Sequence, residues 1–124
     1  MDAERLTRWL ADYVEAWKSY DRESIAALFA ERASYRYHPA DEPIVGVEAI
    51  VDSWLDEPDA PGSYEARYEP YAIEADRAVA TGTSTYFDKA GEVRAVYDNC
   101  FVLRFDPAGR CCEFVEWYVK RPGE

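Results

Sequence analysis

The strongest constraint on the fold is a pair of β-type runs late in the sequence, Glu92–Phe105 and Cys111–Val119. Between them stands Asp-Pro-Ala-Gly (residues 106–109), a sequence typical of the turn in an antiparallel hairpin. A straight strand of about 14 residues would extend roughly 46 Å, because each residue adds ~3.3 Å. A compact domain of 124 residues has no room for such a straight strand. We therefore predict a sheet that curves strongly.

Alternation along these two runs predicts which side chains share the inner face, because successive residues of a strand point to opposite sides. The residues assigned to that face are Asn99, Phe101, Leu103, Phe114, Glu116 and Tyr118. Asp98 then points away from this face and is expected to be structural. Glu116 is a carboxylate on an otherwise apolar surface, so it must be solvated, paired or used chemically.

Three helices are predicted before the β-rich part. In the first, apolar residues recur at helical spacing and form one buried stripe: Leu6, Trp9, Leu10, Tyr13, Val14 and Trp17. A shorter second helix follows Asp21, whose side chain can cap it, and buries Ile25, Leu28 and Phe29. A third helix starts at Gly46, with inward residues Val47, Ile50, Val51, Trp54 and, at the margin of the stripe, Leu55.

The remaining segments are predicted to be strands and loops. A short β run, Ala33–Tyr37, ends at His38-Pro39, and Ala40–Val45 is expected to be a loop. Further strands are expected from Tyr64 and over Ala78–Phe87, and a proline at position 70 indicates a bulge or an edge. We predict a single α+β domain over residues 1–124: a cone-shaped roll with three N-terminal helices packed on a curved, mixed but mostly antiparallel sheet.

The overall charge excludes some classes of partner. The 25 acidic and 14 basic residues give a net charge of −11 without a basic patch, so neither nucleic acid nor an anionic membrane is expected to bind. No apolar run reaches the roughly 18 residues of a membrane span, and the N-terminus lacks a signal-peptide pattern. Cys100, Cys111 and Cys112 fit neither a disulfide framework nor a metal motif. We expect buried thiols in a cytoplasmic protein.

Aromatic residues are frequent, with ten Tyr, four Trp and five Phe. They either fill the core or line a cavity inside it, and the sequence pattern is compatible with both. His38 is the only histidine, and its ordinary pKa of about 6.5 suits acid–base chemistry at neutral pH; the alternative is a solvated histidine at a strand end. A metal site formed by His38, Asp41 and Glu42 is not expected, because so tight a run in a proline-containing loop gives poor ligand geometry.

Several local strings occur in a characteristic order: Tyr13-Val14-Glu15, Phe29-Ala30-Glu31-Arg32-Ala33, His38-Pro39, Gly46-Val47-Glu48-Ala49-Ile50, Val102–Arg110 and Glu116-Trp117-Tyr118. Their order and spacing resemble the nuclear transport factor two-like superfamily over nearly the whole chain. This superfamily includes SnoaL-like proteins, ketosteroid isomerases and limonene-epoxide hydrolases. The resemblance implies a cystatin-like cone. It implies no single activity, because this scaffold hosts isomerases, hydrolases, dehydratases and plain binding proteins.

Ketosteroid isomerases hold an enolate with a Tyr on the first helix and a protonated Asp on a late strand, and they abstract a proton with an Asp that precedes a Pro. By this resemblance Tyr13 stands in the place of the Tyr, His38 in the place of the base, and Phe101 in the place of the protonated Asp. One extra residue before Pro39 means that Tyr37 could hold the base position instead of His38. Isomerisation by the family's own mechanism is therefore not expected.

Two other branches of the superfamily point to Glu116. In limonene-epoxide hydrolases, a late-strand acid works with an Arg and a second acid on an earlier strand to activate water. Glu116 matches the late-strand acid, but Ser and Thr residues (81–85) stand where the Arg and the second acid would be. In SnoaL-like cyclases an acid or a His serves as the base, a role open to His38 or Glu116.

We therefore expect a pocket for a small, mostly apolar molecule. The candidate catalytic residues are His38, Glu116 and Tyr13, and the expected lining comprises Trp17, Tyr37, Trp54, Asn99, Phe101, Phe114 and Tyr118. In an enzyme, His38 or Glu116 would act as the base and Tyr13 would donate a hydrogen bond to an oxyanion, without metal or cofactor. The alternative is a non-catalytic binding or dimerisation module. The resemblance implies a homodimer formed through the exposed sheet face.

Overall fold

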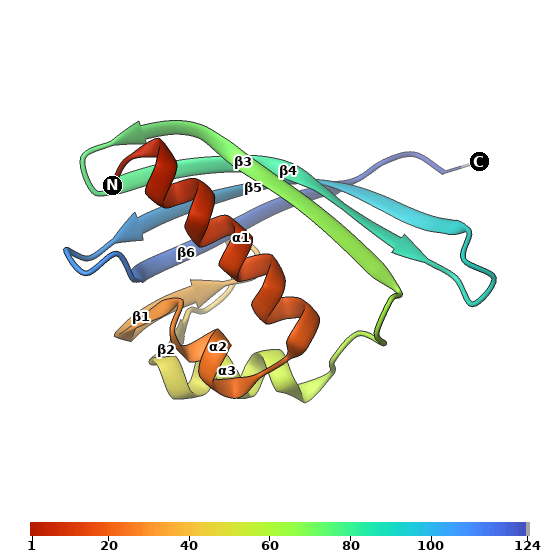
Figure 1. The fold of residues 1–124 in the computed structure, drawn as a ribbon, viewed down its shortest axis with the longest axis horizontal. Helices are drawn as coiled ribbons and strands as arrows, with labels where there is room; N and C mark the ends of the chain where they lie inside the picture. The colour runs from red at the N-terminus through yellow and green to blue at the C-terminus, as the bar shows by residue number, and fades with distance from the viewer. Residues whose placement is uncertain (124) are drawn as a thin grey trace.

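A computed structural model describes residues 1–123, which form three helices and one six-stranded sheet (Figure 1). In chain order the elements are α1 (Ala3–Ser19), α2 (Arg22–Ala26), β1 (Phe29–Arg36), β2 (Ile44–Val45), α3 (Val47–Asp56), β3 (Tyr64–Glu74), β4 (Arg77–Phe87), β5 (Val93–Phe105) and β6 (Cys111–Lys120). The strand order is β2-β1-β6-β5-β4-β3. Strands β1 and β6 run parallel, and the other four pairs run antiparallel. The predicted α+β class and the mixed, mostly antiparallel sheet are confirmed.

The helices cover one face of the sheet. In Figure 1, α1 crosses the long strands β3 to β6, whereas α2 and α3 lie at the end of the sheet formed by β1 and β2. The long strands bend together, as expected for a strand of the length of β5. Strand β3 is an edge strand, and its pairing with β4 shifts between Pro70 and Ala72, so the sequence signal at Pro70 marks both an edge and a bulge.

Local capping fixes the two N-terminal helices. The Asp2 side chain accepts a hydrogen bond from the Arg5 backbone N–H at 2.8 Å and begins α1. The Asp21 side chain accepts from the Ser24 backbone N–H at 3.0 Å and begins α2. In α1 the predicted apolar stripe faces the core, and Trp9 donates its indole N–H to the Leu28 carbonyl at 3.0 Å.

The predicted phase of the β5–β6 hairpin is correct. Asn99, Phe101 and Leu103 on β5 are at most 7% exposed, and Phe114 on β6 is fully buried. The turn between the strands has the expected geometry, because the Gly109 backbone N–H donates to the Asp106 carbonyl at 3.0 Å and Gly109 has a φ of +85°. These four residues lie on the inner face, whereas Glu116 and Tyr118 of β6 face a cavity and Tyr118 is 41% exposed.

Two predicted segments differ from the structure. Phe29 is buried as expected but belongs to β1, not to the second helix, because it pairs with Cys111 of β6 in a parallel arrangement. The segment Ala40–Val45 is not entirely a loop, since Ile44 and Val45 pair with β1 as the short strand β2. In both cases pairing with a strand distant in the sequence overrides the local pattern.

The three cysteines are free thiols in different environments. Cys111 is fully buried, whereas Cys100 and Cys112 are partly exposed, so the expectation of buried thiols holds for Cys111 alone. Burial raises the pKa of the Cys111 thiol. No helix within residues 1–123 combines the length and the apolar character that a membrane crossing requires.

Candidate functional site

The helices and the sheet enclose a cavity of about 530 Å³. Its lining is rich in tyrosine and draws on every long strand as well as α1 and α3: Tyr13, Trp17, Tyr20, Tyr35, Tyr37, Ser53, Trp54, Asp56, Glu57, Asp59, Tyr68, Ser84, Tyr86, Arg94, Tyr97, Asn99, Glu116 and Tyr118. A second hollow of about 620 Å³ lies beside α1 and the β5–β6 turn, but its ionisable side chains are exposed. The first cavity contains an enclosed carboxyl group and is the candidate site.

Most of the residues expected at a site meet in this cavity. Tyr13 and Glu116 line it, as do Trp17, Tyr37, Trp54, Asn99 and Tyr118. Phe101 and Phe114 lie beneath the lining and not in it, since they are 1% and 0% exposed. Their rings support the lining from below: Phe114 stacks on Tyr35 with centroids 4.3 Å apart, and Phe101 packs against Tyr68 at 4.6 Å.

Glu116 is the ionisable centre of the cavity. Its Oε2 accepts a hydrogen bond from the Asn99 amide at 2.8 Å, and the Asn99 oxygen accepts one from the Ser84 hydroxyl at 3.0 Å. Burial raises the pKa of Glu116 to about 7, although the Asn99 hydrogen bond and the nearby His38 act in the opposite direction. Glu116 forms no ion pair with Arg36 or Arg104, the arginines of the neighbouring strand segments, among the described residues.

Three hydrogen-bond donors lie in the same cavity. The hydroxyl oxygens of Tyr13 and Tyr35 are 3.4 Å apart, and burial raises the pKa of both phenols well above the usual range. Both side chains therefore remain neutral and able to donate. Trp54 is 8% exposed, and its indole N–H has no hydrogen-bond acceptor among the described residues. A buried donor without an acceptor costs free energy, which makes this N–H a candidate contact for a ligand.

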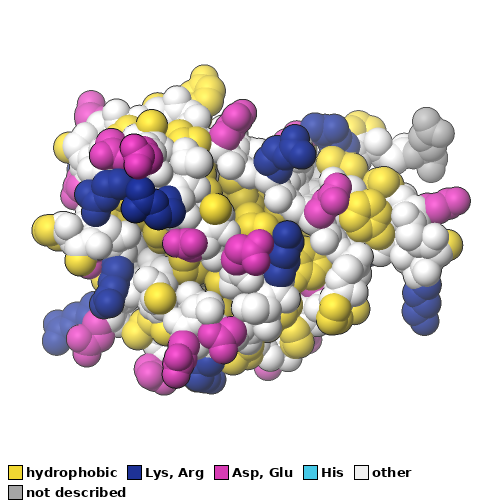
Figure 2. Space-filling view, in the orientation of Figure 1, with side chains coloured by type: hydrophobic (Ala, Val, Ile, Leu, Met, Phe, Trp, Pro, Cys, Tyr) yellow, Lys and Arg dark blue, Asp and Glu magenta, His cyan; other side chains and the backbone are white. Residues whose placement is uncertain are grey.

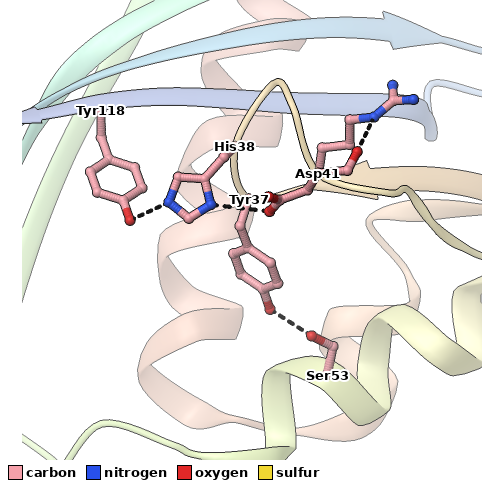
Figure 3. A network of polar contacts seen from close by, with 6 residues as sticks. Tyr37, His38, Asp41, Ser53 and Tyr118 are labelled. Atoms are coloured by element: carbon pink, nitrogen blue, oxygen red, sulfur yellow. Dashed lines mark hydrogen bonds and ion pairs between the residues drawn. The ribbon is translucent and has the colours of Figure 1, made fainter.

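Tyr37 and His38 diverge from adjacent positions (Figure 3). Tyr37 points toward α3, and its hydroxyl lies 2.9 Å from the Ser53 hydroxyl inside the cavity. His38 is half-exposed outside the lining, with Nδ1 3.0 Å from Asp41 Oδ2 and Nε2 2.6 Å from the Tyr118 hydroxyl. The Asp41 carboxylate accepts a hydrogen bond from Nδ1–H. In the neutral ring, Nε2 therefore accepts a hydrogen bond from the Tyr118 hydroxyl. His38 reaches the cavity through Tyr118.

The mouth of the cavity contains a polar group that the sequence did not indicate. Asp59, in the loop after α3, accepts hydrogen bonds from the Trp17 indole at 3.3 Å and from the Tyr20 hydroxyl at 3.2 Å. The Asp59 backbone N–H also donates to the Tyr20 oxygen at 2.9 Å. No local pattern in the sequence indicates a contact with residues about forty positions away. Tyr35 is a different case, because it alternates with Tyr37 along β1 and its place on the same face was readable.

A glycine makes room for one wall of the cavity. A Cβ atom on Gly82 of β4 would lie 2.0 Å from the Arg67 carbonyl oxygen and 2.7 Å from the Tyr68 Cα. The absence of a side chain thus lets β3 approach closely and leaves room for the Tyr68 ring in the lining.

No group of three potential metal ligands occurs within the described part of the chain.

The molecular surface carries both signs of charge. Figure 2 shows Asp and Glu side chains scattered over the face seen in Figure 1, with Lys and Arg in small groups among them. At the mouth, Asp56, Glu57 and Asp59 contribute to the lining together with Arg94, whose guanidinium lies 5.6 Å from the centroid of the Tyr86 ring. The cavity therefore combines an aromatic lining with charged groups at its mouth.

Comparison with known proteins places this geometry in context. A model of the SnoaL-like domain matches residues 10–114. A candidate ketosteroid isomerase from Kribbella flavida DSM 17836 has a similar structure, with a TM-score of 0.71 and 17% identity over 99% of this chain and 84% of its own. A nuclear transport factor two-like protein of unknown function from Cytophaga hutchinsonii ATCC 33406 aligns with a TM-score of 0.66 and 14% identity over 91% of this chain and 98% of its own. No curated protein matches the sequence.

Proposed function

The chain belongs to the SnoaL-like domain family, and we propose that it binds a small molecule in the tyrosine-lined cavity and transfers a proton to or from it with Glu116. The observation that carries this proposal is the enclosed Glu116 carboxyl with a pKa of about 7. A general base works best when its pKa lies near the working pH. Near neutral pH both the ionised and the protonated form of Glu116 are then populated.

The donors across the cavity complete the chemistry. Proton abstraction next to a carbonyl places negative charge on an oxygen, which neutral hydrogen-bond donors stabilise. Tyr13 and Tyr35 supply two hydroxyl groups, and the Trp54 indole supplies an N–H that has no acceptor among residues 1–123. These groups support proton-transfer reactions such as isomerisation, cyclisation or hydrolysis without a cofactor.

His38 has a different role in this proposal. Tyr118 lines the cavity and His38 does not. The Tyr118 hydroxyl lies 2.6 Å from His38 Nε2, so a ligand in the cavity would contact Tyr118 and not His38. We assign His38 and Asp41 to positioning the Tyr118 hydroxyl at the rim. Glu116 is the base and Tyr13 the principal donor.

Binding inside the cavity can be tested with the four indole N–H groups as reporters. A fragment library is screened by nuclear magnetic resonance with 15N-labelled protein. A cavity ligand should shift the indole signals of Trp54 and Trp17, which line the cavity. It should not shift the signal of Trp9, whose indole is hydrogen-bonded to the Leu28 carbonyl, or that of Trp117, which lies on the outer sheet face. Ligands that shift only the Trp117 signal would place binding outside the cavity.

Proton transfer can be tested without knowledge of the natural reaction. Fragments that bind are incubated in deuterium oxide, and deuterium incorporation at carbon is followed by mass spectrometry. The Glu116→Gln variant should lose at least about a hundredfold in exchange rate, the usual contribution of a general base. Glu113→Gln is the matched control, because it removes the same charge from β6 outside the cavity. Equal exchange rates in the parent and in Glu116→Gln would contradict proton transfer by Glu116, and only the proposal of ligand binding would remain.

A second function is favoured by the outer face of the sheet. Val102, Trp117 and Val119 are 37%, 45% and 68% exposed on strands β5 and β6. Exposed apolar groups that adjoin one another often mark a protein interface. We propose that this face forms a homodimer, as the family resemblance implies.

We also propose a cytoplasmic location, because the three cysteines are free thiols, as is usual in a reducing environment.

A further inference from the structure

The charged groups of the cavity are unequal in sign. Four carboxyl groups contribute to the lining (Asp56, Glu57, Asp59 and Glu116), against a single cationic side chain, Arg94. Arg94 is exposed and lies over Tyr86 at the rim, and it makes no ion pair with any of these acids. The acids at the mouth and Glu116 inside the cavity together favour positive over negative ligands.

Glu116 has only part of the hydrogen bonding that an ionised carboxylate can accept. Asn99 donates to Oε2, and no donor to Oε1 occurs within the described residues. Oε1 is not a fully buried atom, so a ligand in the cavity can reach it. A carboxylate offers about four acceptor sites, and hydrogen bonds from a cation are the strongest that an ionised one can accept. A ligand that brings a positive charge to Oε1 would supply the missing partner.

The tyrosines near Glu116 favour the same kind of ligand. Four of them line the cavity together with Glu116: Tyr13, Tyr35, Tyr37 and Tyr68. The rings of Tyr13 and Tyr35 stack on Phe114, so these two side chains offer mainly their hydroxyl groups to a ligand. Phenol oxygens accept hydrogen bonds, so these tyrosines and Glu116 form a tyrosine cage with several acceptors for an ammonium group.

Trp54 adds a second requirement. Its enclosed indole N–H has no acceptor among residues 1–123, although the side chain lines the cavity. A ligand that offers an acceptor atom there relieves this cost.

We propose that the ligand is an organic cation: an aromatic or apolar body that carries a protonated amine, held by Glu116 within the tyrosine cage, and one acceptor atom that faces Trp54. This rests on the proposed function, because it defines the ligand class of the same cavity. It replaces the mostly apolar molecule expected from the sequence.

Probes that share one aromatic body and differ in the charge of the end group test this inference. Tyramine, tyrosol and para-hydroxyphenylacetate share a phenol body and end in an ammonium, a hydroxyl and a carboxylate group. The set is extended with naphthyl and biphenyl bodies that carry the same three ends. Dissociation constants are measured by calorimetry at pH 8, where Glu116 is mainly ionised, and the Trp54 indole signal verifies that each probe occupies the cavity. The amine should bind roughly tenfold to a hundredfold more tightly than the alcohol, as expected for a hydrogen bond to a charged group.

Two variants separate the contribution of Glu116 from that of the net charge. In Glu116→Gln, the amine and the alcohol should bind with similar affinity, while the affinity for the alcohol stays near that of the parent. Glu113→Gln should keep the preference for the amine. Equal affinities of amine and alcohol in the parent, or tighter binding of the carboxylate, would overturn the cationic ligand and leave the cavity proposal intact. If no member of any set shifts the Trp54 signal, the cavity proposal fails together with this inference.

Discussion

Replacement of Glu116 by glutamine should stabilise the protein at alkaline pH. The side chains have the same shape, and the glutamine oxygen can still accept the hydrogen bond from Asn99. What changes is the free energy of carrying a negative charge in the cavity. The pKa of Glu116 rises from an ordinary 4.5 to about 7, which corresponds to about 3 kcal/mol because one pKa unit is ~1.36 kcal/mol.

The sign follows from proton binding in the two states. The folded protein holds the Glu116 proton more tightly than the unfolded chain does, so the free energy of unfolding falls as the pH rises through the interval from 4.5 to about 7. Below this interval the carboxyl is protonated in both states and the charge costs nothing. Above it the charge is present in both states, and the folded state bears the full cost. Glu116→Gln removes this contribution at every pH.

The assay is urea unfolding of the parent and the variant, followed by tryptophan fluorescence between pH 4.5 and pH 8.5. The two proteins should be about equally stable at the acid end, and the variant should lead by about 3 kcal/mol at the alkaline end. Glu113→Gln, on the same strand but outside the cavity, should show no such dependence on pH. A difference between parent and Glu116→Gln that stays constant across this range would refute the raised pKa and the proposed base with it.

Three further outcomes are expected. Gly82→Ala should lower the free energy of unfolding by about 3 kcal/mol, because the new methyl group overlaps the Arg67 carbonyl; a loss below about 1 kcal/mol in urea unfolding would contradict the close approach of β3. The parent should sediment as a dimer at micromolar concentration and Trp117→Arg as a monomer, whereas a monomeric parent would exclude the sheet-face interface. In the native protein a thiol reagent should modify the partly exposed Cys112 but not the fully buried Cys111, and rapid modification of both would contradict the packing of β6 against β1.

The β5–β6 hairpin shows how far local sequence reached. Strict alternation and a turn with a glycine at positive φ were sufficient to place Glu116 and Asn99 on one face. The same pattern identified Phe101 and Phe114 as inward residues but could not distinguish a side chain that lines the cavity from one that supports it. That difference depends on how far each ring extends between the sheet and α1, which is a property of the packed molecule.

His38 and Asp59 show what local sequence could not supply. The histidine was singled out for its pKa, but its neighbours Asp41 and Tyr118 hold it at the rim, and Tyr118 is 80 positions away. Asp59 stands in a loop that composition marks as exposed, yet it contacts Trp17 and Tyr20 on the other side of the cavity mouth. Both placements depend on contacts between segments that are remote in the chain.

The parallel pairing of β1 with β6 governs when the cavity can form. Strand β6 inserts between β1, which is made early, and β5, which precedes it directly in the chain. A nascent polypeptide that still lacks β6 has neither this central pairing nor Glu116, although α1 can already pack on β3. The carboxyl group to which we assign proton transfer is therefore added with the same segment that completes the sheet.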